Sequence, residues 1–150
     1  MSGCSFIPFV MHLLVFGNSM GSRYTLEEQQ GYLVMRISGP YDYWDFLQYP
    51  DLIRKCCESA GVYRILVDVV AVTYAELPTI ELFFLGEKVA EVLRDQIKIA
   101  LVWHGDTKDN LLQMVAANRA ASIRIFETTE TAALWLLYDH EDEPFDFRAS

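Results

Sequence analysis

The sequence has little basic charge. Its 12 lysine and arginine residues are outnumbered by 21 aspartate and glutamate residues, which gives a net charge of −9 and a pI of about 4.7. No basic run is longer than the pair Arg54-Lys55. Because phosphate backbones and anionic lipid headgroups attract positive surfaces, this balance argues against nucleic acid and against an anionic membrane surface as partners.

Cysteine is scarce as well. The three cysteines are Cys4, Cys56 and Cys57, and an odd number without spaced pairs does not indicate a disulfide framework. Cysteine and histidine residues at the spacing of metal ligands are also lacking. We therefore expect free thiols, no metal site and a reducing, cytoplasmic location.

Familiar catalytic motifs are missing. The glycines of segment 17–21 precede the first well-patterned strand, whereas a phosphate-binding loop links a strand to a helix. The sequence has no Gly-x-Ser-x-Gly elbow, and nothing around its cysteines and histidines supports Cys-His catalysis. We predict a protein without catalytic residues or a cofactor.

The length of 150 residues is typical of one domain, which buries roughly 70% of its unfolded surface.

The apolar stretch 6–16 is too short to span a bilayer as a helix, and no Lys or Arg precedes it as in a secretion signal. Residues 1–19 are an extension outside the domain core, a weak secretion signal or an extra segment packed on the fold; we favour the first. The domain then covers 20–138, and the acidic segment 139–150 is predicted to be a solvated tail.

Hydrophobic patterning predicts alternating strands and helices in the domain. Strands are expected at 23–29, 32–38, 64–70, 97–103 and 122–126, a turn at 43–48, and helices at 50–60, 79–94, from 106 or 107 to 121, and from 128 or 129 to 137. The first two strands form a hairpin. The later alternation indicates parallel pairing, so the predicted fold is α/β, with a mixed, mainly parallel central sheet of about five strands, an N-terminal antiparallel hairpin and about four helices.

Several short stretches within residues 23–137 resemble a known family. They are 64–68 (RILVD), 72–73 (VT), 85–87 (LGE), 98–102 (KIALV), 117–119 (ANR), 124–126 (RIF) and 131–136 (TAALWL). They resemble the SpoIIAA-like family, a bacterial branch related to STAS domains and often compared with CRAL-TRIO lipid-binding domains. The resemblance implies the STAS-like fold and a regulatory role through protein contacts.

The resemblance does not extend to the regulatory serine of STAS anti-anti-sigma factors. The matching stretch is Glu76-Leu77-Pro78-Thr79, in which the nearest hydroxyl is that of Thr79. We expect Thr79 to be an N-cap or first-turn residue of its helix and no phosphoryl switch there. The helix end Asn118-Arg119-Ala120 also lacks the glycine of the family.

Polar residues follow the predicted parallel strands, where open α/β sheets usually bind their ligands. Asp68, His104 and Asp106 could form a weak metal or acid–base site there, but their spacing matches no known motif. We expect His104 to contribute to ligand or partner binding without a catalytic role.

The second candidate site is aromatic. Tyr41, Tyr43, Trp44, Phe46 and Tyr49 lie within nine positions, and Phe83-Phe84 cannot both point inward from one helix. One hypothesis is a groove for an apolar ligand or a partner between segment 41–49 and helix 79–94, with Tyr43, Trp44, Phe46, Phe83 and Phe84 among its residues. The alternative is that these rings only fill the core.

Two classes of function follow. The first is a non-catalytic STAS-like module that acts through protein–protein contacts, including contacts with a second copy in a homodimer. The second is a carrier or sensor of a small hydrophobic, lipid-like ligand, by analogy with CRAL-TRIO domains. An apolar cavity would favour the second class, whereas a solid core with an exposed aromatic patch would favour the first.

Overall fold

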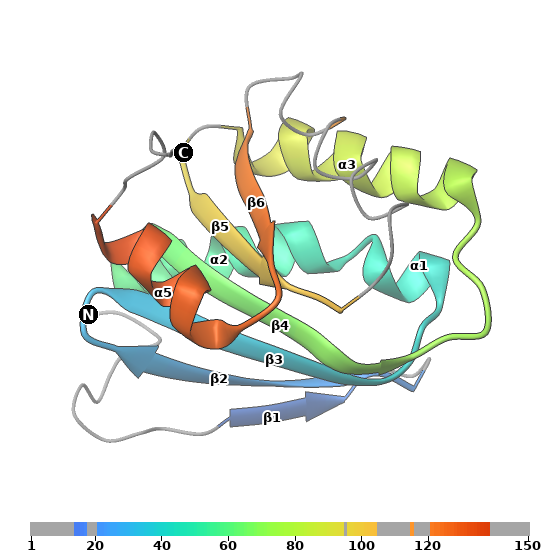
Figure 1. Ribbon diagram of the computed structural model, residues 1–150, viewed down its shortest axis with the longest axis horizontal. Helices are drawn as coiled ribbons and strands as arrows, with labels where there is room; N and C mark the ends of the chain where they lie inside the picture. Colours follow the sequence, from blue (N-terminus) through green and yellow to red (C-terminus); the bar gives the residue numbers. More distant parts are fainter. Residues whose placement is uncertain (1–13, 18–20, 95, 105–114, 116–120, 139–150) are drawn as a thin grey trace.

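A computed structural model of the chain describes residues 14–17, 21–94, 96–104, 115 and 121–138 (Figure 1). It contains one six-stranded sheet with the strand order β1-β2-β3-β4-β5-β6. The strands are β1 (Leu14–Gly17), β2 (Arg23–Gln29), β3 (Tyr32–Pro40), β4 (Arg64–Thr73), β5 (Lys98–Val102) and β6 (Ser122–Phe126). The pairs β1–β2 and β2–β3 are antiparallel, and the remaining three pairs are parallel.

The mixed, mainly parallel α/β fold predicted from the sequence is confirmed. The apolar runs 64–70 and 97–103 form β4 and β5, which pair in parallel from Arg64↔Lys98 to Asp68↔Val102. The sheet has six strands instead of about five, because residues 14–17 pair with β2. That edge strand lies inside the stretch assigned to an N-terminal extension, and the domain boundary at residue 20 stays a prediction.

Four helices accompany the sheet in the described residues: α1 (Tyr43–Phe46), α2 (Tyr49–Ala60), α3 (Thr79–Leu93) and α5 (Thr129–Tyr138). The helix expected up to residue 121 lies outside the described residues, apart from Val115, which is helical and buried. Among the described residues, no helix is both long and apolar enough to cross a membrane.

Local chemistry explains where α2 begins and ends. Pro50 is in the first helical turn, where its missing N–H costs no hydrogen bond. Gly61 ends the helix in a left-handed conformation with φ of 71°, and its N–H donates to the carbonyl oxygen of Cys57 at 2.8 Å. Both features were expected from the sequence.

The sheet separates two hydrophobic layers. On one face, Ile65, Val67 and Ile99 pack against α2 and α3; on the other, Leu66 and Ala100 pack against α5. Figure 1 shows α5 in front of the sheet, on the face opposite to α2 and α3. The larger layer, between the sheet and α1, α2 and α3, contains the site described below.

Candidate functional site

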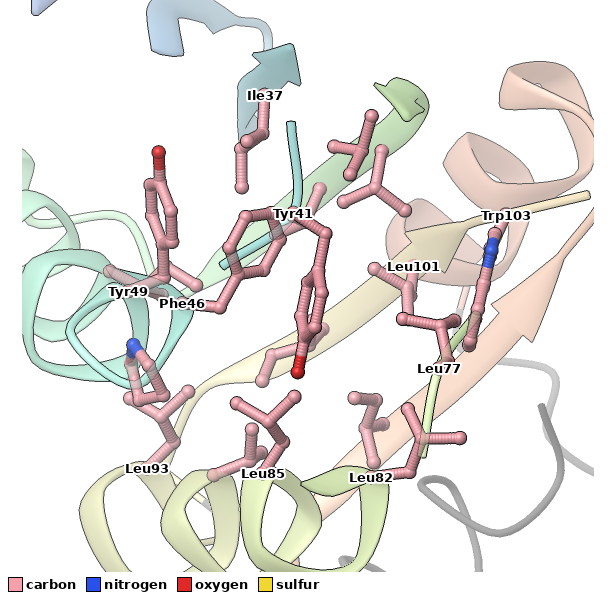
Figure 2. A pocket seen from close by; sticks show the side chains of 18 of the residues that line it. Ile37, Tyr41, Phe46, Tyr49, Leu77, Leu82, Leu85, Leu93, Leu101 and Trp103 are labelled. Carbon is pink, nitrogen blue, oxygen red and sulfur yellow. The ribbon is translucent and has the colours of Figure 1, made fainter. Parts of the chain in front are cut away.

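An apolar cavity of about 120 Å³ lies between the sheet and helices α1, α2 and α3. Its wall is almost entirely carbon. Figure 2 shows side chains from the sheet and from the surrounding helices pointing into it. The labelled lining residues are Ile37, Tyr41, Phe46, Tyr49, Leu77, Leu82, Leu85, Leu93, Leu101 and Trp103.

Three aromatic residues mark the carboxyl ends of three adjacent parallel strands at this cavity. Tyr41 directly follows β3, Tyr74 follows β4 and Trp103 follows β5, and all three line the wall. The backbone holds two of them in place: the N–H of Tyr41 donates to the Thr73 carbonyl at 2.8 Å, and that of Trp103 to the Phe126 carbonyl at 3.0 Å. The cavity therefore reaches the sheet edge at which open α/β folds bind ligands.

A bulge in β4 adds a further wall residue. Arg36 of β3 pairs with Asp68 and Ser38 pairs with Ala71, so β4 contains one extra residue. Val69 before this irregularity and Val72 after it both line the cavity, although strict alternation would place them on opposite faces. The side chain of Asp68 accepts a hydrogen bond from the Val70 N–H at 3.0 Å and so satisfies a backbone donor at the bulge.

The hydroxyl and indole groups of the wall are engaged with protein partners. The Tyr41 hydroxyl donates to Glu81 Oε1 at 2.8 Å, and Trp103 Nε1 donates to the Tyr74 hydroxyl at 3.4 Å. Burial, followed by the bond to Glu81, raises the pKa of Tyr41 above its ordinary value of 10.0. The Tyr41 hydroxyl is therefore neutral at physiological pH.

A buried polar cluster lies beside the cavity wall. Asp45 is 0% exposed and accepts a short hydrogen bond from Ser22, whose hydroxyl is also 2.9 Å from the Tyr49 hydroxyl. Burial raises the pKa of Tyr49, and Asp45 adds to this, while the bond to Ser22 opposes it. Within the described part of the chain Asp45 Oδ1 has no hydrogen-bond partner, and Asp45 lines a polar hollow of about 330 Å³ together with Lys55.

The structure divides the predicted aromatic site residues. Phe46 lines the cavity, with its ring centroid 5.0 Å from that of Tyr41. Tyr43 packs on the edge of the core, and the neighbouring Trp44 is 69% exposed. Phe83 and Phe84 contact each other with ring centroids 5.4 Å apart, but neither belongs to the cavity wall.

Of the polar residues predicted at the strand ends, the structure describes Asp68 and His104. His104 is exposed, and its Nε2 lies 2.8 Å from the Glu127 carbonyl oxygen. Asp106 lies outside the described residues, and within the described ranges no three His, Cys, Asp or Glu side chains cluster as metal ligands. Thr79 is an exposed first-turn residue of α3, directly after the N-cap Pro78.

The sequence argument missed Tyr74, Leu77 and Trp103 as site residues. The available signal was positional, because Tyr74 and Trp103 directly follow the apolar strands whose carboxyl ends mark the expected ligand-binding edge.

The chain has a SpoIIAA-like fold, as the comparison with solved structures shows. An anti-sigma factor antagonist from Mycobacterium paratuberculosis superposes with a TM-score of 0.56 at 15% identity over 81% of this chain and 99% of that one. A Shewanella loihica protein with a SpoIIAA-like fold gives a TM-score of 0.51 at 19% identity over 77% and 93%. No protein-family model matches the sequence, and no curated protein matches it.

Proposed function

We propose that the protein is a non-catalytic, STAS-like binding module that carries or senses a small hydrophobic molecule in the cavity between its sheet and helices α1, α2 and α3. The observation that carries the proposal is the cavity itself, which has a volume of about 120 Å³, is lined by apolar side chains and lies at the carboxyl ends of the strands. Protein interiors are normally packed as densely as organic crystals, so an unfilled apolar space at this edge is best explained by a ligand.

Energetics support a ligand in this place, because an apolar molecule in the pocket removes apolar side chains from water, at roughly 25 cal/mol per Å² of surface buried. The proposal includes no catalytic step and no phosphoryl switch at Thr79. It places the protein in the cytoplasm, where the buried thiols of Cys56 and Cys57 stay reduced.

Ligand binding can be tested by thermal unfolding of the full chain with a panel of fatty acids, phospholipids and aromatic hydrocarbons. A ligand at one hundred times its dissociation constant stabilises the fold by about 2.7 kcal/mol, which raises Tm by about 5 °C or more for a domain of this size. Native mass spectrometry of freshly purified protein gives a second measurement, since a retained molecule adds mass. A panel without any stabilising member, together with a bare protein mass, would contradict the proposal.

A second candidate function is contact with a protein partner, including a second copy of this chain. Exposed rings and apolar side chains favour it: Trp44 on α1, and Ile80 and Phe84 one turn apart on α3. One structural neighbour is an anti-sigma factor antagonist, a name that implies a protein target for that neighbour. Sedimentation equilibrium of the wild type and of Trp44→Ala tests self-association. A wild type that stays monomeric at all concentrations argues against the homodimer.

A further inference from the structure

The hydrogen-bond donors of the cavity wall are mostly used by protein partners. The Tyr41 O–H is used by Glu81, the Tyr49 hydroxyl is bonded to Ser22, and the Trp103 N–H is used by Tyr74. The Tyr74 hydroxyl accepts this last bond and keeps its own O–H, so a ligand carboxylate in the cavity would exchange several bonds to water for at most one bond from these groups. Such a loss weakens binding roughly ten- to a hundredfold.

The charge around the cavity also disfavours anions. No lysine or arginine is among the described residues that line it. The Tyr41 hydroxyl of the wall is hydrogen-bonded to the Glu81 carboxylate, which brings a negative group close to the cavity. The whole chain carries a net charge of −9. A fatty-acid carboxylate at the aromatic rim would therefore meet negative charge.

The cavity volume limits the size of the ligand. Drug-sized ligands occupy pockets of roughly 300 Å³ or more, whereas this cavity measures about 120 Å³. An apolar cavity of roughly 150 Å³ in another protein takes benzene. A single ring therefore fits the space, whereas most of a long acyl chain would project from its open side.

The aromatic side chains are arranged to accept a flat ring. Phe46 and Tyr49 have centroids 5.2 Å apart and planes at 67°, and Tyr74 and Trp103 have centroids 6.5 Å apart and planes at 75°. Both pairs are edge-to-face and therefore offer the cavity ring edges as well as ring faces. A planar aromatic guest can extend such packing, which branched aliphatic molecules cannot.

From these observations we infer that the ligand of the cavity is an uncharged, single-ring aromatic molecule of about the size of toluene, and that fatty acids are excluded. This inference rests on the proposed function and deepens it by naming the chemical class of the ligand.

The test uses toluene and benzoate, which are similar in size but differ in charge, together with dodecanoate as the acyl chain. The indole N–H signal of Trp103 in the NMR spectrum of the full chain is the readout, and the signals of Trp44 and Trp135 serve as internal references outside the cavity. We expect toluene to shift the Trp103 signal saturably, benzoate to bind at least about tenfold more weakly, and dodecanoate to leave the signal unchanged.

Two neighbouring valines provide matched variants. Val69→Phe places a ring in the cavity and is expected to abolish the toluene shift, whereas Val70→Phe changes an exposed residue outside the wall and should preserve it. Val72→Leu is a milder filling variant, expected to weaken toluene binding severalfold if Val69→Phe does not fold.

The outcomes separate the inference from the proposed function. One outcome is that dodecanoate or benzoate shifts the Trp103 signal, binds more tightly than toluene and no longer shifts the signal in Val69→Phe. This outcome overturns the inference and leaves the proposed function intact. If none of the three probes moves the Trp103 signal, the inference is overturned. If the thermal panel is also negative, the proposed function fails with it.

Discussion

Tyr41 and Glu81 are joined by a hydrogen bond of 2.8 Å in which the phenol donates to the carboxylate. The bond links the residue that follows β3 to the first turn of α3. It therefore ties two walls of the cavity together, and its loss should be measurable as lost stability even though the aromatic ring remains.

Tyr41→Phe is expected to lower the free energy of unfolding by about 1 kcal/mol at pH 7, the usual net contribution of a hydrogen bond. The ring, which lines the cavity, is retained. Tyr43→Phe is the matched control, because the structure shows no hydrogen bond from the Tyr43 hydroxyl within the described residues. Urea unfolding of the three proteins measures the difference. Equal losses in both variants would show that the bond to Glu81 contributes nothing specific.

The same pair predicts a pH dependence. Burial and Glu81 raise the pKa of Tyr41 in the folded state. The contribution of Tyr41 to the free energy of unfolding is therefore fully present below the pKa of the unfolded chain, about 10, and is lost as the pH rises above that value, because the unfolded tyrosine then loses its proton first. The stability gap between wild type and Tyr41→Phe should therefore narrow and close by about pH 11. A gap that stays constant from pH 7 to 11 would contradict the raised pKa.

Gly39 lies at a close approach between two chain segments. Its φ is +103°, and a Cβ atom there would be 2.9 Å from the carbonyl oxygen of Gly21. Gly39→Ala is expected to cost about 2 kcal/mol or more, since it adds a clash with backbone to a strained φ. Gly61→Ala is the control, because its φ of +71° is strained but its Cβ would meet nothing within 4 Å. Chemical denaturation should rank Gly39→Ala as the more destabilised variant, and the opposite ranking would show that the segments separate easily.

The parts of the fold predicted from the sequence are those set by local patterns. The nearly continuous apolar runs identified β4 and β5, and Pro50 and Gly61 identified the ends of α2. The cavity was not predictable in the same way, because Val69 and Val72 line it together only through the bulge in β4. No pattern in the residues marks that bulge.

The expected aromatic site shows the same limit. The sequence places five aromatic residues within segment 41–49, and in the structure Phe46 contacts Tyr41 and lines the cavity. Composition does not tell which face a ring occupies, and so Trp44 and Phe84 are exposed while Trp103 faces the cavity. Side-chain direction depends on where each strand ends, which the patterns fixed only to within a few residues.

The Ser22 hydroxyl holds Asp45 and Tyr49 together in a buried position. Ser22→Ala should cost about 1–3 kcal/mol, because it removes a partner from a buried carboxylate. Tyr49→Phe should cost about 1 kcal/mol, and the double variant should cost less than the sum, since both single changes remove the same Ser22–Tyr49 bond. Urea unfolding of the four proteins gives this coupling. Strict additivity would indicate that the two hydroxyls do not interact.

Cys57 is the thiol for which the structure predicts the slowest reaction. It is fully buried in α2, and burial, with smaller effects from Cys56 and Glu58, raises its pKa from 9.0 to about 12. Since the thiolate is the reactive form, and a pKa three units above the ordinary value leaves roughly a thousandth of the usual thiolate at pH 7, the alkylation rate of Cys57 in the folded protein should lie roughly a thousandfold below that in the unfolded chain, apart from labelling through transient unfolding. Iodoacetamide labelling read by peptide mass spectrometry measures this, with the urea-unfolded chain at the same pH as the reference. Labelling of Cys57 in the folded protein at a rate close to that of the unfolded chain would show that α2 does not shield it from solvent.

The raised pKa of Cys57 also predicts a stability effect. It contributes stability that is present below about pH 9 and is lost as pH rises toward 12, and Cys57→Ala should remove that part of the alkaline loss of stability.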